Sequence, residues 1–201
     1  MSGQFWASPG VEPKRAYRWL VRFNTNHDQL DEWLIKKVSP RPSWKLSEST
    51  HFFLNHTFYY PGRVEYDELS VTLVDAVTPN SARTLQTWLS QAGYVPPSEA
   101  NRNFGTVSKA GFTAPGNVGL SQVEIEQLNE TGHVLETWTL HNTWVKAVKY
   151  GDLDYESDDL LDIELTLRYD FFTLTQGSAR GVAGSEFNPV GDVVNALNPG
   201  S

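Results

Sequence analysis

The segment from residue 161 to residue 170 constrains the fold most, because apolar and polar side chains alternate along it without a break. Apolar residues occupy the odd positions from Leu161 to Tyr169, and charged or hydroxyl residues occupy the even positions from Asp162 to Asp170. A period of two is typical of a β-strand with one face in a core and the other in solvent. The chain must therefore build a sheet that buries one face.

Several other segments repeat this alternation or are rich in aromatic and β-branched residues, which favours strands. They are residues 15–23, 33–38, 51–60, 69–75, 123–127 and 134–148. Glu130-Thr131-Gly132 predicts a hairpin turn, and Pro61-Gly62 predicts a turn that ends the strand over 51–60.

One helix interrupts this series of strands. Pro79 and Asn80 supply an entry and a cap, and Gly93 marks the exit. Between them, apolar side chains recur at helical spacing at Ala82, Leu85, Trp88 and Leu89. The sequence therefore predicts a mainly β fold, a β-barrel or sandwich with one flanking α-helix.

Glycine and proline divide the chain into a core and appendages. We expect an N-terminal arm over 1–13, a β-domain over 14–175 and a C-terminal arm over 176–201. Within the β-domain, residues 95–120 read as a long irregular loop, and such loops are uncommon unless they have a function.

Composition excludes several classes of function. The chain has 201 residues, no cysteine, a net charge of −8 and a pI near 5.1. Disulfides and thiolate metal sites are excluded, and a duplex-binding surface is disfavoured because such surfaces are strongly basic. No apolar run reaches about 18 residues and no secretory signal begins the chain, so we expect no membrane partner and a cytoplasmic site of synthesis.

Candidate catalytic and metal-binding groups are sparse. His51 and His56 are five residues apart in a strand-like segment, which places them on opposite faces and disfavours a shared metal. Asp162 and Glu164 lie about 7 Å apart on one strand face, within reach of glycoside hydrolysis, but a solvated strand face produces such pairs routinely. We predict no enzyme activity, no metal and no cofactor, and a carbohydrate-binding β-sandwich remains an alternative for a chain with 7 tryptophans.

A set of segments, in this order, resembles the tail tube protein of contractile-tailed (T4-like) bacteriophages, which is related to the tube proteins of type VI secretion. The segments are RAYRWLVRF (15–23), FYYPGRV (58–64), LSVTLVD (69–75), HNTWVKAVKYGDLDY (141–155), DDL (158–160) and LTLRYD (165–170). The resemblance covers most of residues 15–175.

The resemblance implies a structural subunit of the virion tail, assembled in the host cytoplasm. Six copies would form a ring, and stacked rings would form a tube that conducts DNA. Its implied partners are the tail sheath, baseplate, tail terminator and tape measure proteins, besides the transiting DNA. The tube of a phage-like contractile injection system is the alternative within the same class.

Physical reasoning favours pooled strands and a bore that does not attract DNA. Because barrels of about 16–18 strands enclose only an aqueous channel, one chain of this length cannot surround a duplex. An acidic or neutral wall would let DNA slide. We therefore predict that Glu124, Glu126, Asp162 and Glu164 line the lumen, and the alternative is that some of them face the sheath or a neighbouring ring. Phe5 and Trp6 in the N-terminal arm and Phe187 in the C-terminal arm are the candidates for assembly contacts.

Overall fold

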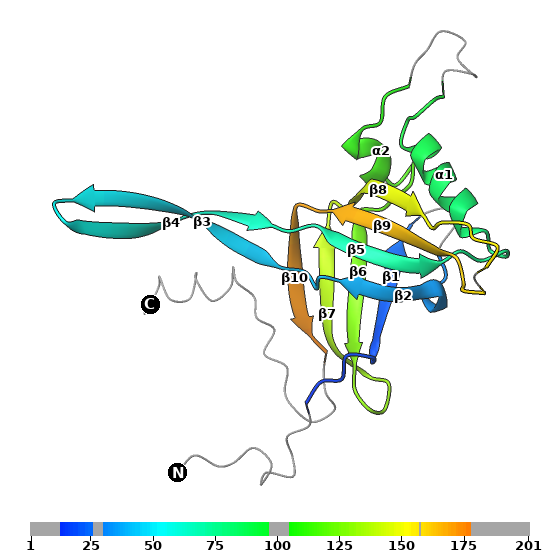
Figure 1. The fold of residues 1–201 in the computed structure, drawn as a ribbon, viewed down its shortest axis with the longest axis horizontal. Coiled ribbons are helices and arrows are strands. Elements are labelled where there is room, and N and C mark those ends of the chain that lie inside the picture. The colour runs from blue at the N-terminus through cyan, green and yellow to red at the C-terminus, as the bar shows by residue number, and fades with distance from the viewer. Residues whose placement is uncertain (1–12, 26–29, 97–104, 157, 178–201) are drawn as a thin grey trace, which may run out of the picture. The chain divides into compact units, whose positions relative to one another are not determined.

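The computed structural model describes residues 13–25, 30–96, 105–156 and 158–177, and these form a mainly β structure, as the sequence predicts (Figure 1). The strands are β1 (Trp19–Asn24), β2 (Ile35–Ser39), β3 (Trp44–Phe53), β4 (His56–Tyr66), β5 (Leu69–Val74), β6 (Gln122–Leu128), β7 (Val134–His141), β8 (Trp144–Tyr150), β9 (Asp162–Arg168) and β10 (Phe171–Gln176). The helices are the 3-10 turn η2 (Glu32–Leu34), α1 (Ser81–Gln91) and the short α2 (Lys109–Thr113).

The described strands form three sheets. Sheet A has the order β1-β6-β7-β10, sheet B has the order β2-β5-β9-β8, and β3 pairs with β4 alone. The chain divides into two units, of which unit 2 covers residues 21–124 and 138–173. The described part of unit 1 comprises residues 13–20, 125–137 and 174–177. Sheet B and the β3–β4 hairpin therefore belong wholly to unit 2.

Strand β9 is the alternating segment with which the sequence analysis began, and it forms the centre of sheet B. It pairs antiparallel with β5 on one side and with β8 on the other. The side chains of Ile163, Leu165 and Leu167 are fully buried, as are those of Leu69, Val71 and Leu73 on β5. The buried face predicted from the alternation is therefore confirmed.

Helix α1 begins and ends where the sequence predicts. The Asn80 side chain accepts a hydrogen bond from the Arg83 backbone N–H at 2.8 Å, which caps the first turn. Gly93 follows the helix with a φ of +109°, a value that suits glycine. Trp88 is buried on the inner side of the helix, with its ring 5.9 Å from that of Phe23.

The segment 95–120 differs from the irregular loop that the sequence predicts. Ser108 caps helix α2, and Phe112, Val118 and Leu120 are buried in unit 2. Gly111 lets α2 lie against the end of α1, because a Cβ at this position would stand 2.2 Å from the Ala92 carbonyl oxygen. Gly111 thus permits close packing, and the described part of this segment, residues 105–120, is not irregular throughout.

Unit 1 is held by polar contacts among its three segments. Gln127 donates from its amide nitrogen to the carbonyl oxygens of Arg15 and Arg18, at 2.8 and 2.6 Å. Lys14 forms an ion pair with the buried carboxylate of Glu136. The predicted turn after β6 is present, with the Asn129 side chain accepting from the backbone N–H groups of Thr131 and His133.

Candidate assembly surfaces

The β3–β4 hairpin, residues 44–66, is an extended and strongly exposed part of unit 2, and we call it the arm. Every residue of β3 is exposed, and so is nearly every residue of β4. Large apolar side chains are nonetheless frequent on it: Trp44, Leu46, Phe52, Phe53, Leu54, Phe58, Tyr59, Tyr60 and Val64 are all exposed. A large exposed apolar surface commonly marks an interaction site.

The turn of the arm lies at Leu54 and Asn55, and the prediction of a turn at Pro61-Gly62 is wrong. Pro61 stands opposite Glu48 beside a register shift in β3, and a two-stranded arm tolerates a proline because each strand has a free edge. A Cβ on Gly62 would lie 2.3 Å from the Ser47 hydroxyl oxygen, which accepts from the Arg63 backbone N–H. These two residues thus fit a bulge within the arm.

The tip of the arm, residues 51–58, concentrates apolar side chains around a strained turn. Leu54 has a φ of 52° and is 89% exposed, although glycine or asparagine is far more common in that conformation. The register His51↔Phe58 and Phe53↔His56 places these four side chains on one face. The sequence prediction that His51 and His56 point to opposite faces is therefore wrong, because the intervening turn restores them to the same side.

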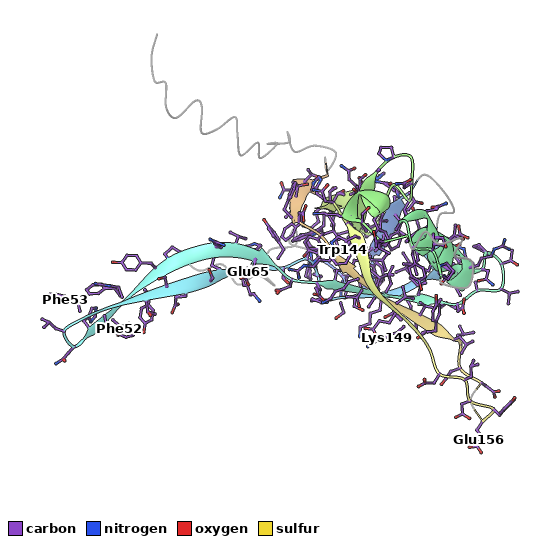
Figure 2. The ribbon with its side chains drawn as sticks, turned by 90° about the horizontal axis from the view of Figure 1, so that it is seen from above. Phe52, Phe53, Glu65, Trp144, Lys149 and Glu156 are labelled. Carbon is purple, nitrogen blue, oxygen red and sulfur yellow. The ribbon has the colours of Figure 1, made fainter. Side chains whose placement is uncertain are left out.

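An aromatic cluster fixes the root of the arm to the body of unit 2. Phe172 packs against Tyr66 and Trp138, with ring centroids 5.4 and 5.3 Å apart, and Tyr169 adjoins Tyr66 at 6.1 Å. Burial in this cluster raises the pKa of the Tyr169 phenol. The Ser43 hydroxyl donates to the Asp67 carboxylate at 3.1 Å across the base of the arm. The arm therefore leaves the body in a defined direction (Figure 2).

Two of the four predicted lumen residues share the polar face of sheet B. Asp162 binds the Lys36 ammonium at 2.7 Å, and Glu164 lies 3.6 Å from Lys149 and accepts from the Ser70 hydroxyl at 3.0 Å. Glu68 at the end of the same sheet pairs with Lys146 and Arg168. The carboxylates of this face are thus matched by basic side chains, an arrangement suited to a solvated surface.

The other two predicted lumen residues lie elsewhere. Glu124 and Glu126 belong to β6 in sheet A, so the structure does not gather the four carboxylates on one sheet. Glu124 is half-buried, whereas Glu126 is only 7% exposed. The alternation along β6 is imperfect at this point, because Ile125 and Glu126 are adjacent and both buried.

A loop that joins β8 to β9, residues 151–161, forms a second exposed surface, and we call it the acidic loop. It carries Asp152, Asp154, Glu156, Asp158 and Asp159 and no basic residue. Leu153, Tyr155 and Leu160 are also strongly exposed on it, with Leu153 at 84%. An open hollow is lined by Leu153, Tyr155, Leu160 and Leu161, by acidic side chains of the loop and by Lys36. Residues 151–161 were not among the functional residues predicted from the sequence, although the run of acidic residues with embedded leucines was a signal for this surface.

Phe5, Trp6 and Phe187, which the sequence predicts as assembly contacts in the two terminal segments, lie outside the described residues. Among the residues that the structure does describe, no group of three or more histidines and carboxylates could hold a metal ion. Over the same ranges, no helix has the length and apolar character needed to span a membrane.

The model of the T4-like virus tail tube protein family matches residues 44–173, which include the arm, strands β5, β8 and β9 of sheet B and the acidic loop. The chain belongs to the T4-like virus tail tube protein family. A tail tube protein of Serratia phage KSP90 is 24% identical to this member over 169 residues, covering 81% of this chain and 89% of the relative. The resemblance inferred from the ordered segments is therefore confirmed.

Solved structures support the same tail tube fold. A chain of the anti-feeding prophage baseplate has a TM-score of 0.56 at 22% identity, covering 83% of this chain and 97% of that one. A chain of the sheath-tube complex of an extracellular contractile injection system, PVC, has a TM-score of 0.53 at 17% identity, covering 82% and 92%. The carbohydrate-binding alternative receives no support from these relatives.

Proposed function

We propose that this tail tube protein is the non-enzymatic, repeating subunit of a virion tail, in which six copies close into a ring and rings stack into a tube that conducts DNA. The observation that carries the proposal is the arm, a rigidly rooted hairpin with aromatic side chains that unit 2 does not cover. A monomer gains nothing from such a surface, whereas a neighbouring copy can bury it.

The free edges of sheet B support closure through neighbouring copies. Among the described strands, β2 and β8 each have one edge in that sheet with no neighbouring strand. Each carries a register shift beside a lysine, Lys36 in β2 and Lys146 in β8. Bulges and lysines discourage uncontrolled pairing of edge strands. The free subunit can therefore stay soluble until a correctly placed neighbour completes the sheet.

Negative-stain electron microscopy of the purified chain tests this proposal. We expect six-fold rings or hollow rods from the wild type. A tip variant, Phe52→Ser with Phe53→Ser and Leu54→Asn, should remain folded but lose the rods. Val107→Ser is the matched control, because Val107 is also exposed but precedes α2. A wild type that remains monomeric at every concentration would contradict the proposal.

The polar face of β9 is the part of the predicted lumen set that we assign to the bore. Since its carboxylates face lysines, the wall would be charge-balanced, and such a wall still lets DNA slide. Asp162→Asn with Glu164→Gln would leave Lys36 and Lys149 unmatched and should slow DNA ejection from assembled particles. Lys36→Gln with Lys149→Gln should not slow it. Equal ejection rates in both variants would remove β9 from the bore.

The remaining partners follow from the same proposal. The relatives include chains from a sheath-tube complex, a baseplate and a sheath/tube terminator. We extend those partner classes to this chain and add a tape measure protein in the lumen, with assembly in the host cytoplasm. Phe5, Trp6 and Phe187 are proposed as assembly contacts, and deletion of residues 1–10 should abolish polymerisation while leaving a soluble subunit.

A second candidate is the tube of a phage-like contractile injection system. The observation that favours it is that one solved relative, the chain of the PVC sheath-tube complex, comes from an extracellular contractile injection system. Neighbouring genes separate the two candidates, because capsid and terminase genes accompany a phage tail and are not needed by an injection system.

A further inference from the structure

The arm and the acidic loop leave sheet B at opposite ends. In the β5–β9 pair, Leu69 faces Leu167 at one end and Val74 faces Asp162 at the other. The arm ends at Tyr66, three residues before the first end, while the acidic loop runs directly into Asp162 at the second. Figure 2 shows this separation, with Phe52 and Phe53 far to one side of β8 and Glu156 beyond its other end.

The arm is long enough to reach past the end of a sheet. Its strand β3 has 10 residues, which span about 33 Å at ~3.3 Å per residue. The 6 residues of β5 span only about 20 Å by the same measure. A copy aligned head to tail with another can therefore bring its tip to the far end of the neighbour's sheet B.

The two ends have complementary chemistry. The tip presents Phe52, Phe53 and Leu54, and the hollow beside the acidic loop is lined by four large apolar side chains. His51 and His56 are the only side chains from Thr50 to Tyr60 that can take a positive charge, and the loop carries five carboxylates without a basic residue. His51 faces Phe58, and His56 faces Phe53 and packs edge-on against Phe58 at 4.7 Å, so no charged group of the arm opposes them on that face.

We infer that the acidic loop and its hollow are the receptor for the arm tip of a second copy of this chain. The inference rests on the proposed stacking of subunits and names the surface that receives the arm. The contact is heterologous, joining two different surfaces, and a contact of that kind generates an open polymer when it does not close on itself. Stacking then proceeds by the same tip-to-loop contact at every level.

Disulfide trapping tests the contact directly, because the chain has no cysteine of its own. Leu54→Cys with Leu160→Cys places one thiol at the tip and one at the hollow. Under oxidising conditions, we expect a ladder of covalent oligomers beyond the dimer. The control is Leu54→Cys with Val107→Cys, because Val107 belongs to the end of sheet B opposite to the hollow. Val107 lies two residues before Lys109, which binds Asp170 just after the last residue of β9. The control and both single-cysteine chains should stop at dimers.

The outcomes separate this inference from the proposed function. Tubes that form without a ladder would overturn the receptor assignment and leave the tube function intact. Absence of tubes from the wild-type chain would instead overturn the function. A ladder of equal extent in the control pair would show unspecific collisions and would also overturn the assignment.

A charge comparison provides a second test that does not need cysteines. His51→Lys with His56→Lys should assemble at least as well as the wild type, because the new charges face the acidic loop. His51→Glu with His56→Glu should raise the critical concentration for tube formation by about tenfold. Both variants remove the same imidazole side chains, so an equal change of the critical concentration in the two would contradict the charge complementarity.

Discussion

At the scale of single residues, Asp170 links three separate segments of unit 2. Its carboxylate accepts from the Lys109 ammonium at 2.5 and 2.6 Å and from the Asn142 amide at 2.9 Å. The hydrogen bond from Lys109 lowers the pKa of Asp170 below its usual value of 3.8, and Asn142 adds to this effect. Asn142 itself has a φ of 54° in the turn between β7 and β8, so this side chain also holds a tight turn.

The lowered pKa of Asp170 predicts a stability that depends on acid. Because the folded-state pKa lies below the unfolded one, the stabilisation is present above about pH 4 and is lost as pH falls through the folded-state pKa. The side chain is 43% exposed, so we expect Asp170→Asn to cost no more than about 1 kcal/mol at pH 7. Urea unfolding at pH 7 and pH 3 checks this. If the variant and the wild type differed in free energy of unfolding by the same amount at pH 3 as at pH 7, the predicted role of ionised Asp170 would be contradicted.

Gly111 and Gly116 form a matched pair that separates close packing from chain flexibility. Gly111→Ala should destabilise the subunit by about 1–3 kcal/mol, because its Cβ would overlap the Ala92 carbonyl oxygen. Gly116→Ala should be neutral or slightly stabilising, since no atom lies within 4 Å of its Cβ position. Thermal unfolding of both variants measures the contrast, and equal melting temperatures would show that α2 does not need this close approach.

At the scale of elements, the cap of α1 is the clearest link from sequence to stability. Asn80→Ala removes the acceptor for the Arg83 backbone N–H and should cost about 1 kcal/mol. Asn80→Asp keeps an acceptor at the same place and is the control. Circular dichroism during thermal unfolding should show the alanine variant melting several degrees below the aspartate variant.

The elements also show which features a sequence can and cannot predict. Strand β9 and helix α1 follow from local periodicity and capping, so both were predicted within a few residues. Helix α2 could not be predicted in the same way, because it is held by the approach of Gly111 to Ala92, a contact across distant segments. The place of Pro61 could not be predicted, because a proline followed by glycine indicates a turn locally and its pairing with Glu48 depends on a distant strand.

For the candidate assembly surfaces, the sequence could predict which residue types occur but not how distant strands bring them together. Asp162 and Glu164 were placed on one face by alternation, but their lysine partners come from β2 and β8, which periodicity cannot align. Glu126 was expected on a polar face and is buried, and its neighbour Ile125 is buried too, so both faces of β6 are covered at this point. The arm was read as an ordinary strand, since nothing local shows that its two faces both lack a core.

At the scale of the whole molecule, a subunit that exposes a rooted aromatic arm should be far less stable alone than in an assembly. Any neighbour that binds only the folded chain raises its stability by mass action, so the melting temperature should increase with protein concentration. Differential scanning calorimetry across a hundredfold range of concentration measures this. The Phe52→Ser, Phe53→Ser, Leu54→Asn variant should melt at one temperature throughout, close to that of the dilute wild type, because the substituted side chains are exposed in the free subunit. If the variant kept the concentration dependence, the arm would not be the element that couples folding to assembly, and the edges of sheet B would take that place.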